Sequence, residues 1–176
     1  PAHAQTARAP ARIGWITYNS AAVNAPYLEA FLKGMNELGH TEGKSFVMVP
    51  RFGDDRPESV EGMARELTTE KPDMIFALGA AAMDTIRVVR GIPIIYGFSG
   101  DPVAAGWATS FSTPHENLTG VTFLSIELNG KRIEMLKQAF PSMQRLAVLA
   151  NPLHPGEDLE IADCRRAAEQ FGMSLS

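Results

Sequence analysis

The stretch Gly97-Phe98-Ser99-Gly100 follows an apolar run and comes one residue short of a catalytic pattern. In the G-x-S-x-G motif a nucleophilic serine lies on a tight turn between a strand and a helix, and the flanking glycines make room for its strained backbone. Here Asp101 stands in place of the second glycine, and no later Asp and His are spaced to complete a triad with Ser99. Asp101 followed by Pro102 instead suits the capped start of a short helix over residues 103–105. We therefore expect no hydrolytic nucleophile here, and the chain is not predicted to be an enzyme.

Other candidate sites for chemistry fail on spacing. Residues 39–45, GHTEGKS, have three residues between the glycines where a phosphate-binding loop needs four. This segment also leads from a helix into a strand, so no helix N-terminus would face a phosphate. Asp54-Asp55 is typical of a solvated turn before a helix. The four histidines are scattered, and the single Cys164 allows no internal disulfide. We predict neither a metal site nor a cofactor.

The composition is that of a globular protein with a hydrophobic core. Apolar residues make up 45% of the 176 residues and charged residues 20%, which is ordinary for such proteins. A net charge of −4 and a pI of about 5.6 argue against a nucleic-acid or anionic-membrane partner. No apolar run approaches the about 18 residues of a membrane-spanning helix.

The first residues predict export. Ala2-His3-Ala4 followed by Gln5 fits the small-x-small site at which signal peptidase cuts. No cysteine follows this site, so a lipid anchor is not expected. On this interpretation residues 1–11 are the disordered remnant of a leader, and the protein is periplasmic.

From Arg12 onward short apolar runs alternate with helical patterns. We expect strands at residues 13–17, 46–49, 74–78, 92–96, 118–123 and 146–150, and helices at 26–38, 57–70, 81–89, 127–139 and 157–171. Strict alternation with continuous apolar strands predicts a parallel sheet with helices on both faces. In such sheets a ligand binds at the carboxyl ends of the strands. The loops there offer hydroxyls, carboxylates and amides at helix starts, which suit a small zwitterion or acid.

Six stretches, taken in order, resemble one protein family. They are RIGWIT, YLEAFLKGMNELGHTEGKSF, PDMIFALGAAA, IPIIYGFSGDPVAAG, NLTGVTFLS and ELNGKRIEMLKQAFPSMQRLAVLANP. Together they resemble the ABC transporter substrate-binding family whose best-known members bind aromatic amino acids such as tryptophan and tyrosine. The similarity runs from Arg12 to the end of the chain.

This resemblance implies a type I periplasmic binding protein, in which two α/β lobes enclose a ligand cleft. Lobe one, with a flavodoxin-like, doubly wound parallel sheet, would span residues 12–124. Residues 125–176 would hold the crossover and the start of a second lobe, incomplete in this chain. Ligand contacts would come from strand ends: Tyr18, Asn19, Ser20, Gly79, Ala80, Ala81, Ser99, Asp101 and Phe123 from lobe one, and Asn151 and Pro152 from lobe two.

Two departures leave the solute open. Relatives often carry Thr or Ser where Ala80 stands. The solute can therefore be an aromatic or other carboxylate compound as well as an amino acid. Family members also continue beyond Ser176. The implied partners are a small-molecule solute and an ABC permease in the inner membrane, with a homodimer possible through the unfinished sheet. The alternative function is the ligand-sensing domain of a receptor or regulator with the same fold.

Overall fold

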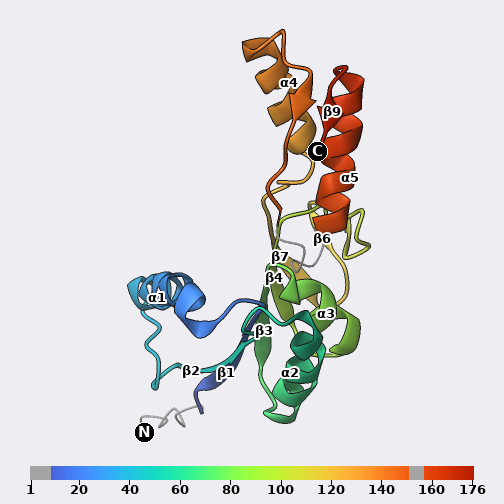
Figure 1. Cartoon of the computed structure of the whole chain (residues 1–176). Coiled ribbons are helices and arrows are strands. Elements are labelled where there is room, and N and C mark those ends of the chain that lie inside the picture. The colour runs from blue at the N-terminus through green and yellow to red at the C-terminus, as the bar shows by residue number, and fades with distance from the viewer. Residues whose placement is uncertain (1–8, 151–156) are drawn as a thin grey trace, which may run out of the picture.

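A computed structural model describes residues 9–150 and 157–176, and its centre is a parallel sheet (Figure 1). The sheet contains β1 (Ala11–Thr17), β2 (Phe46–Phe52), β3 (Met74–Leu78), β4 (Ile94–Phe98) and β7 (Leu118–Thr122), in the order β2-β1-β3-β4-β7. The chain moves outward from β1 to β2 and then returns to the other side of β1, so the strand order reverses between β1 and β3. The alternating pattern predicted the parallel sheet, and the family resemblance implied this doubly wound, flavodoxin-like strand order. In sheets of this kind ligands bind at the carboxyl ends of the strands, where the strand order reverses.

Helices cover both faces of this sheet (Figure 1). On one face α1 (Ala21–Glu37) places Phe31 against Trp15 and Phe76, with ring centroids 5.3 and 4.8 Å from that of Phe31. Trp15 and Phe76 are paired neighbours on β1 and β3. Because successive side chains of a strand point to opposite faces, Ile16, Ile75 and Ala77 lie on the other face.

That other face carries the main core. Its helices are α2 (Pro57–Thr69) and α3 (Ala81–Val88). Thirteen buried residues from these helices, β1, β3, β4 and the segments beside them form one hydrophobic cluster. The cluster accounts for the apolar strands, since β1 and β3 lie between α1 on one side and α2 and α3 on the other.

The last third of the chain forms a second, smaller group of elements (Figure 1). It contains α4 (Asn129–Ala139), β8 (Arg145–Leu146), α5 (Glu157–Gln170) and β9 (Ser174–Leu175), and β8 pairs with β9 in parallel. Its buried cluster has only four members, Ile133, Ala167, Ala168 and Met173. No helix of the described ranges is long and apolar enough to cross a bilayer.

Several predicted bounds are wrong in instructive ways. The first helix begins at Ala21 rather than at Pro26, because Ser20 caps it and Pro26 is accommodated inside it. Residues 102–106 form a turn instead of a short helix. The predicted strand at 146–150 shrinks to the two residues of β8. The hairpin of β5 (Ala108–Ser110) and β6 (Thr113–Pro114), and the strand β9, were not anticipated.

Candidate functional site

A cleft of about 620 Å³ lies between the carboxyl ends of the strands and α5. Its walls come from four segments: the β3–α3 junction, the end of β4 with the turn after it, the residues before α4, and one side of α5. The described residues that line it are Gly79, Ala80, Met83, Phe98, Ser99, Gly100, Asp101, Ala104, Ala105, Ile126, Glu127, Leu159, Glu160, Ala162, Asp163 and Arg166. This volume is in the range of pockets that enclose small organic ligands, about 300–1,000 Å³.

The β3–α3 junction forms one wall through a tight turn. Gly79 has φ +59°, and its N–H donates to the carbonyl of Gly97 at 2.8 Å, which ties the ends of β3 and β4 together. Most other residues adopt such a φ only at an energetic cost, so glycine suits this turn. Ala80 follows as the N-cap of α3 without a capping side chain. Of the three predicted contacts here, Gly79 and Ala80 line the cleft, whereas Ala81 is fully buried in the core.

The turn after β4 forms the second wall and is organised by Asp101. The Asp101 Oδ1 accepts the N–H groups of Val103 at 2.7 Å and of Ala104 at 3.3 Å, as a capping aspartate does. Its Oδ2 has no hydrogen-bond partner among the described residues. The Ser99 carbonyl accepts both the N–H and the hydroxyl of Ser125, at 2.7 and 3.1 Å. Ser99 and Asp101 therefore line the cleft from a segment fixed by its own backbone.

The crossover toward α4 runs beside that wall. Phe123 N–H donates to the Phe98 carbonyl at 3.0 Å, and Leu124 has φ +49°, a left-handed conformation that is costly for a leucine. The side chain of Phe123 is 70% exposed and does not line the cleft. The predicted ligand contact at Phe123 thus lies beside the cleft, on the chain that enters the second group of elements.

The loop after β1 is held by its own polar contacts. The Tyr18 hydroxyl donates to the carbonyl of Asp55 at 2.6 Å, and its ring is buried. Burial, together with the nearby carboxylates of Asp55 and Glu58, raises the pKa of Tyr18. The Asn19 N–H donates to the Thr17 hydroxyl at 3.4 Å. Tyr18, Asn19 and the capping Ser20 do not line the cleft.

The fourth wall is a face of α5 that the sequence did not single out. Leu159, Ala162, Asp163 and Arg166 are three, four and seven residues apart, so they lie on one side of the helix. Arg166 donates to the Asp163 carboxylate. The helical pattern of α5 was predictable, but the face turned to the cleft was not, because this spacing also fits an ordinary solvated face. Asn151 and Pro152, the predicted lobe-two contacts, lie outside the described residues.

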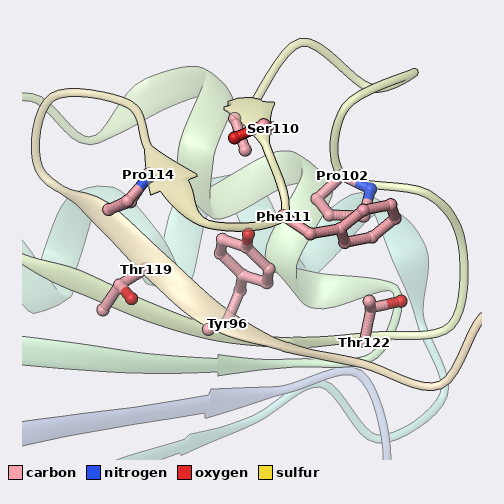
Figure 2. A pocket seen from close by; sticks show the side chains of 9 residues that line it. Tyr96, Pro102, Ser110, Phe111, Pro114, Thr119 and Thr122 are labelled. Atoms are coloured by element: carbon pink, nitrogen blue, oxygen red, sulfur yellow. The ribbon is translucent and has the colours of Figure 1, made fainter.

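A second, smaller pocket lies away from this edge, under the β5–β6 hairpin (Figure 2). Its volume is about 70 Å³, too small for an amino-acid-sized ligand. Figure 2 shows the Tyr96 ring crossing the floor with its hydroxyl pointing toward the hairpin. Trp107 packs on Tyr96 and Phe98, at 5.4 and 4.4 Å between ring centroids, and so anchors the segment between β4 and β7. The larger cleft is therefore the candidate binding site.

A model of the ABC transporter substrate binding protein family matches residues 22–176. The chain belongs to this family. The fold and the cleft at its strand ends agree with that assignment, and the resemblance drawn from the six sequence stretches is confirmed. Comparison with curated proteins finds no match.

Solved structures show the same fold. The chain is similar to a conserved domain protein of Vibrio cholerae, with 21% identity and a TM-score of 0.80 over 95% of this chain and 56% of that one. An ABC domain of Streptococcus pneumonia in complex with L-Trp has 17% identity and a TM-score of 0.75, over 96% of this chain and 56% of that one. A solute binding protein of Rhodopseudomonas palustris, in complex with 3,4-dihydroxy benzoic acid, has 15% identity and a TM-score of 0.66, over 94% and 46%. The chain thus spans about half the length of these structures, and it has the type I periplasmic binding protein fold.

Proposed function

We propose that the protein is the exported solute-binding component of an ABC importer and reversibly captures a small solute, an amino acid or an aromatic or carboxylate compound. The observation that carries the proposal is the cleft of about 620 Å³ at the strand ends of a doubly wound sheet, with the second group of elements as its far wall. Family membership supports the same role. The protein would act in the periplasm and hand its solute to a permease in the inner membrane.

Capture in such a cleft follows from its lining. The apolar side chains of Met83, Phe98, Ile126 and Leu159 come from the four segments that line the cleft. A solute between them loses water on both sides, and each Å² of apolar surface so buried contributes about 25 cal/mol. Gly79, Ala80, Ser99 and Asp101 are the predicted contacts that we propose for the polar end of the solute.

The proposal is tested by filling the cleft. Ala105 is an exposed residue of the lining, so Ala105→Trp should occupy the solute space without disturbing the core. Ala30→Trp, at an exposed position of α1, is the matched control. Thermal unfolding is measured for each chain with a panel of amino acids, aromatic acids and aromatic amines. A solute at a hundred times its Kd should stabilise the unmodified chain by about 2.7 kcal/mol.

We expect at least one solute to raise the Tm of the unmodified chain and of Ala30→Trp, but not of Ala105→Trp. A solute that stabilises all three chains equally would bind elsewhere and contradict the assignment of the site. No stabilisation by any member of the panel would contradict the capture of these solute classes.

A further inference from the structure

The charged residues that line the cleft are mostly acidic. Four carboxylates, those of Asp101, Glu127, Glu160 and Asp163, face it together with one guanidinium, that of Arg166. These described residues give the lining a formal charge of −3. Because Arg166 donates to Asp163, its positive charge is already paired and is a poor partner for a ligand carboxylate.

The other three carboxylates have oxygen atoms that can accept a hydrogen bond from a ligand. The Asp101 cap uses Oδ1 alone. Glu127 and Glu160 make no ion pair with any described residue. A carboxylate that faces a largely apolar cleft loses part of its hydration when a solute enters, and a positively charged donor on that solute restores the lost interaction.

Helix ends oppose this charge but do not reverse it. The N-terminal ends of α3, α4 and α5 lie at the cleft, next to Ala80, Glu127 and Glu160. Each helix N-terminus acts as roughly half a positive charge. Three of them offset about half of the formal −3, so the solute space keeps a negative balance. Such a balance favours an ammonium group over a carboxylate.

We infer that the cleft selects a cation with an apolar body, an amine of roughly aromatic size, over the amino acid or carboxylic acid with the same body. This inference rests on the solute-binding function proposed above. The apolar body lies between Phe98 and Leu159, and the ammonium group donates to the carboxylates at the rim. A solute with only a carboxylate meets no unpaired cation among the described lining residues.

The test compares solutes that share a body and differ in charge. Three sets are used: tryptamine, L-tryptophan and indole-3-propionate; phenethylamine, L-phenylalanine and 3-phenylpropionate; isopentylamine, L-leucine and 4-methylpentanoate. Their affinities for the 176-residue chain are measured by calorimetry at low and high salt. In each set that binds, we expect the amine to bind about tenfold more tightly than the acid, with the advantage reduced at high salt.

Two cleft variants and one control variant locate the effect. Glu160→Gln removes a charge at the cleft, and Glu169→Gln removes the same charge from an exposed position further along α5. Asp101→Asn keeps the Oδ1 that caps the turn and removes only the charge. We expect Glu160→Gln and Asp101→Asn each to weaken amine binding severalfold and to leave acid binding unchanged or improved. Glu169→Gln should bind like the unmodified chain.

The possible outcomes separate the two proposals. If no member of any set binds, the solute-binding function fails and the inference falls with it. If the acids or amino acids bind as tightly as the amines, the function stands and the charge selection is overturned. Equal losses of amine affinity in Glu160→Gln and Glu169→Gln would also overturn the charge selection, because the effect would then come from the net charge of the protein alone.

Discussion

Asn24 shows how a single polar residue fixes one end of α1. Its Oδ1 accepts the indole N–H of Trp15 at 2.7 Å, and its Nδ2 donates to the Thr17 hydroxyl at 3.3 Å. Both contacts are buried, and they join the first turn of α1 to β1 directly below the loop of Tyr18 and Asn19. The position of that loop therefore depends on hydrogen bonds inside the lobe rather than on the loop itself.

Asn24→Ala should lower the free energy of unfolding by about 2 kcal/mol, because the Trp15 indole N–H is left buried without a partner. Urea unfolding measures the loss. Trp15→Phe removes the other partner of this hydrogen bond. The double variant should lose less free energy of unfolding than the two single variants lose together. Strict additivity would show that the two side chains do not act together.

Cys164 is a probe of α5, the helix that lines the cleft. Burial, and then the negative charges of Asp163 and Glu160, raise the pKa of its thiol above the ordinary value. The folded chain therefore holds the protonated thiol to higher pH than the unfolded chain does. The stability linked to this difference is present below the unfolded pKa and is lost as the pH rises through the folded pKa.

Alkylation by iodoacetamide tests this directly, since the chain has only one cysteine. The pH midpoint of the reaction should be higher in the native chain than in the chain unfolded by urea, because the thiolate is the reactive form. A native midpoint equal to or below the unfolded one would contradict the predicted shift.

At the scale of elements, the pairing of β4 with β7 depends on a residue of β7 that has no side chain, Gly120. Gly120 faces the Tyr96 carbonyl and ring, and a Cβ at this position would clash with both. Backbone atoms cannot turn aside as a flexible side chain can. The glycine thus sets how closely the outer strand β7 approaches β4.

Gly120→Ala should destabilise the protein by at least about 2 kcal/mol, through strain between the two strands. Gly62→Ala is the matched control, since nothing lies within 4 Å of a Cβ at that position of α2. There the loss of backbone freedom in the unfolded chain should raise stability by about 0.5–1 kcal/mol. Thermal unfolding of the two variants should therefore shift in opposite directions. A Gly120→Ala chain as stable as the unmodified one would show that β7 can move away from β4.

Element types followed from the sequence more readily than side-chain directions did. Alternation of apolar runs predicted the sheet, its parallel strands and its helices, because buried strands and one-sided helices leave distinct patterns. Periodicity did not reveal that Tyr18 turns inward to the Asp55 carbonyl, since a strand-end tyrosine fits a core or a cleft equally well. Apolar spacing predicted the first helix only from residue 26, but Ser20 caps the helix and it begins at Ala21. Which face of α5 lines the cleft depends on how the helix packs in the tertiary structure, and the local sequence pattern does not predict this.

At the scale of the molecule, the two groups of elements differ in how much they bury. The sheet with α2 and α3 has thirteen buried residues in its cluster, and the group of α4 and α5 has four. Apolar burial is the main stabilising contribution in folding, so the second group should open at lower free energy than the first.

Amide hydrogen exchange under native conditions measures this difference. Amides in the middle of β1 and β3 should exchange only through global unfolding, whereas those of α4 and α5 should exchange faster and through smaller openings. A solute that binds in the cleft should slow exchange in α5 as well. Equal protection of α5 and β3 in the free chain would contradict the prediction.

The two outer strands of the sheet differ in what they offer to another chain. In β2, Pro50 lacks a backbone N–H, and proline in a sheet is confined to edge strands with its nitrogen turned to solvent. In β7, Thr119, Gly120 and Val121 are exposed and contain no proline, and β7 pairs only with β4 among the described residues. Within the part of the chain that the structure describes, the sheet thus has one edge open to strand addition. Association of copies through β7 would use the same edge twice about a two-fold axis, and such an assembly closes at two copies instead of growing into a filament.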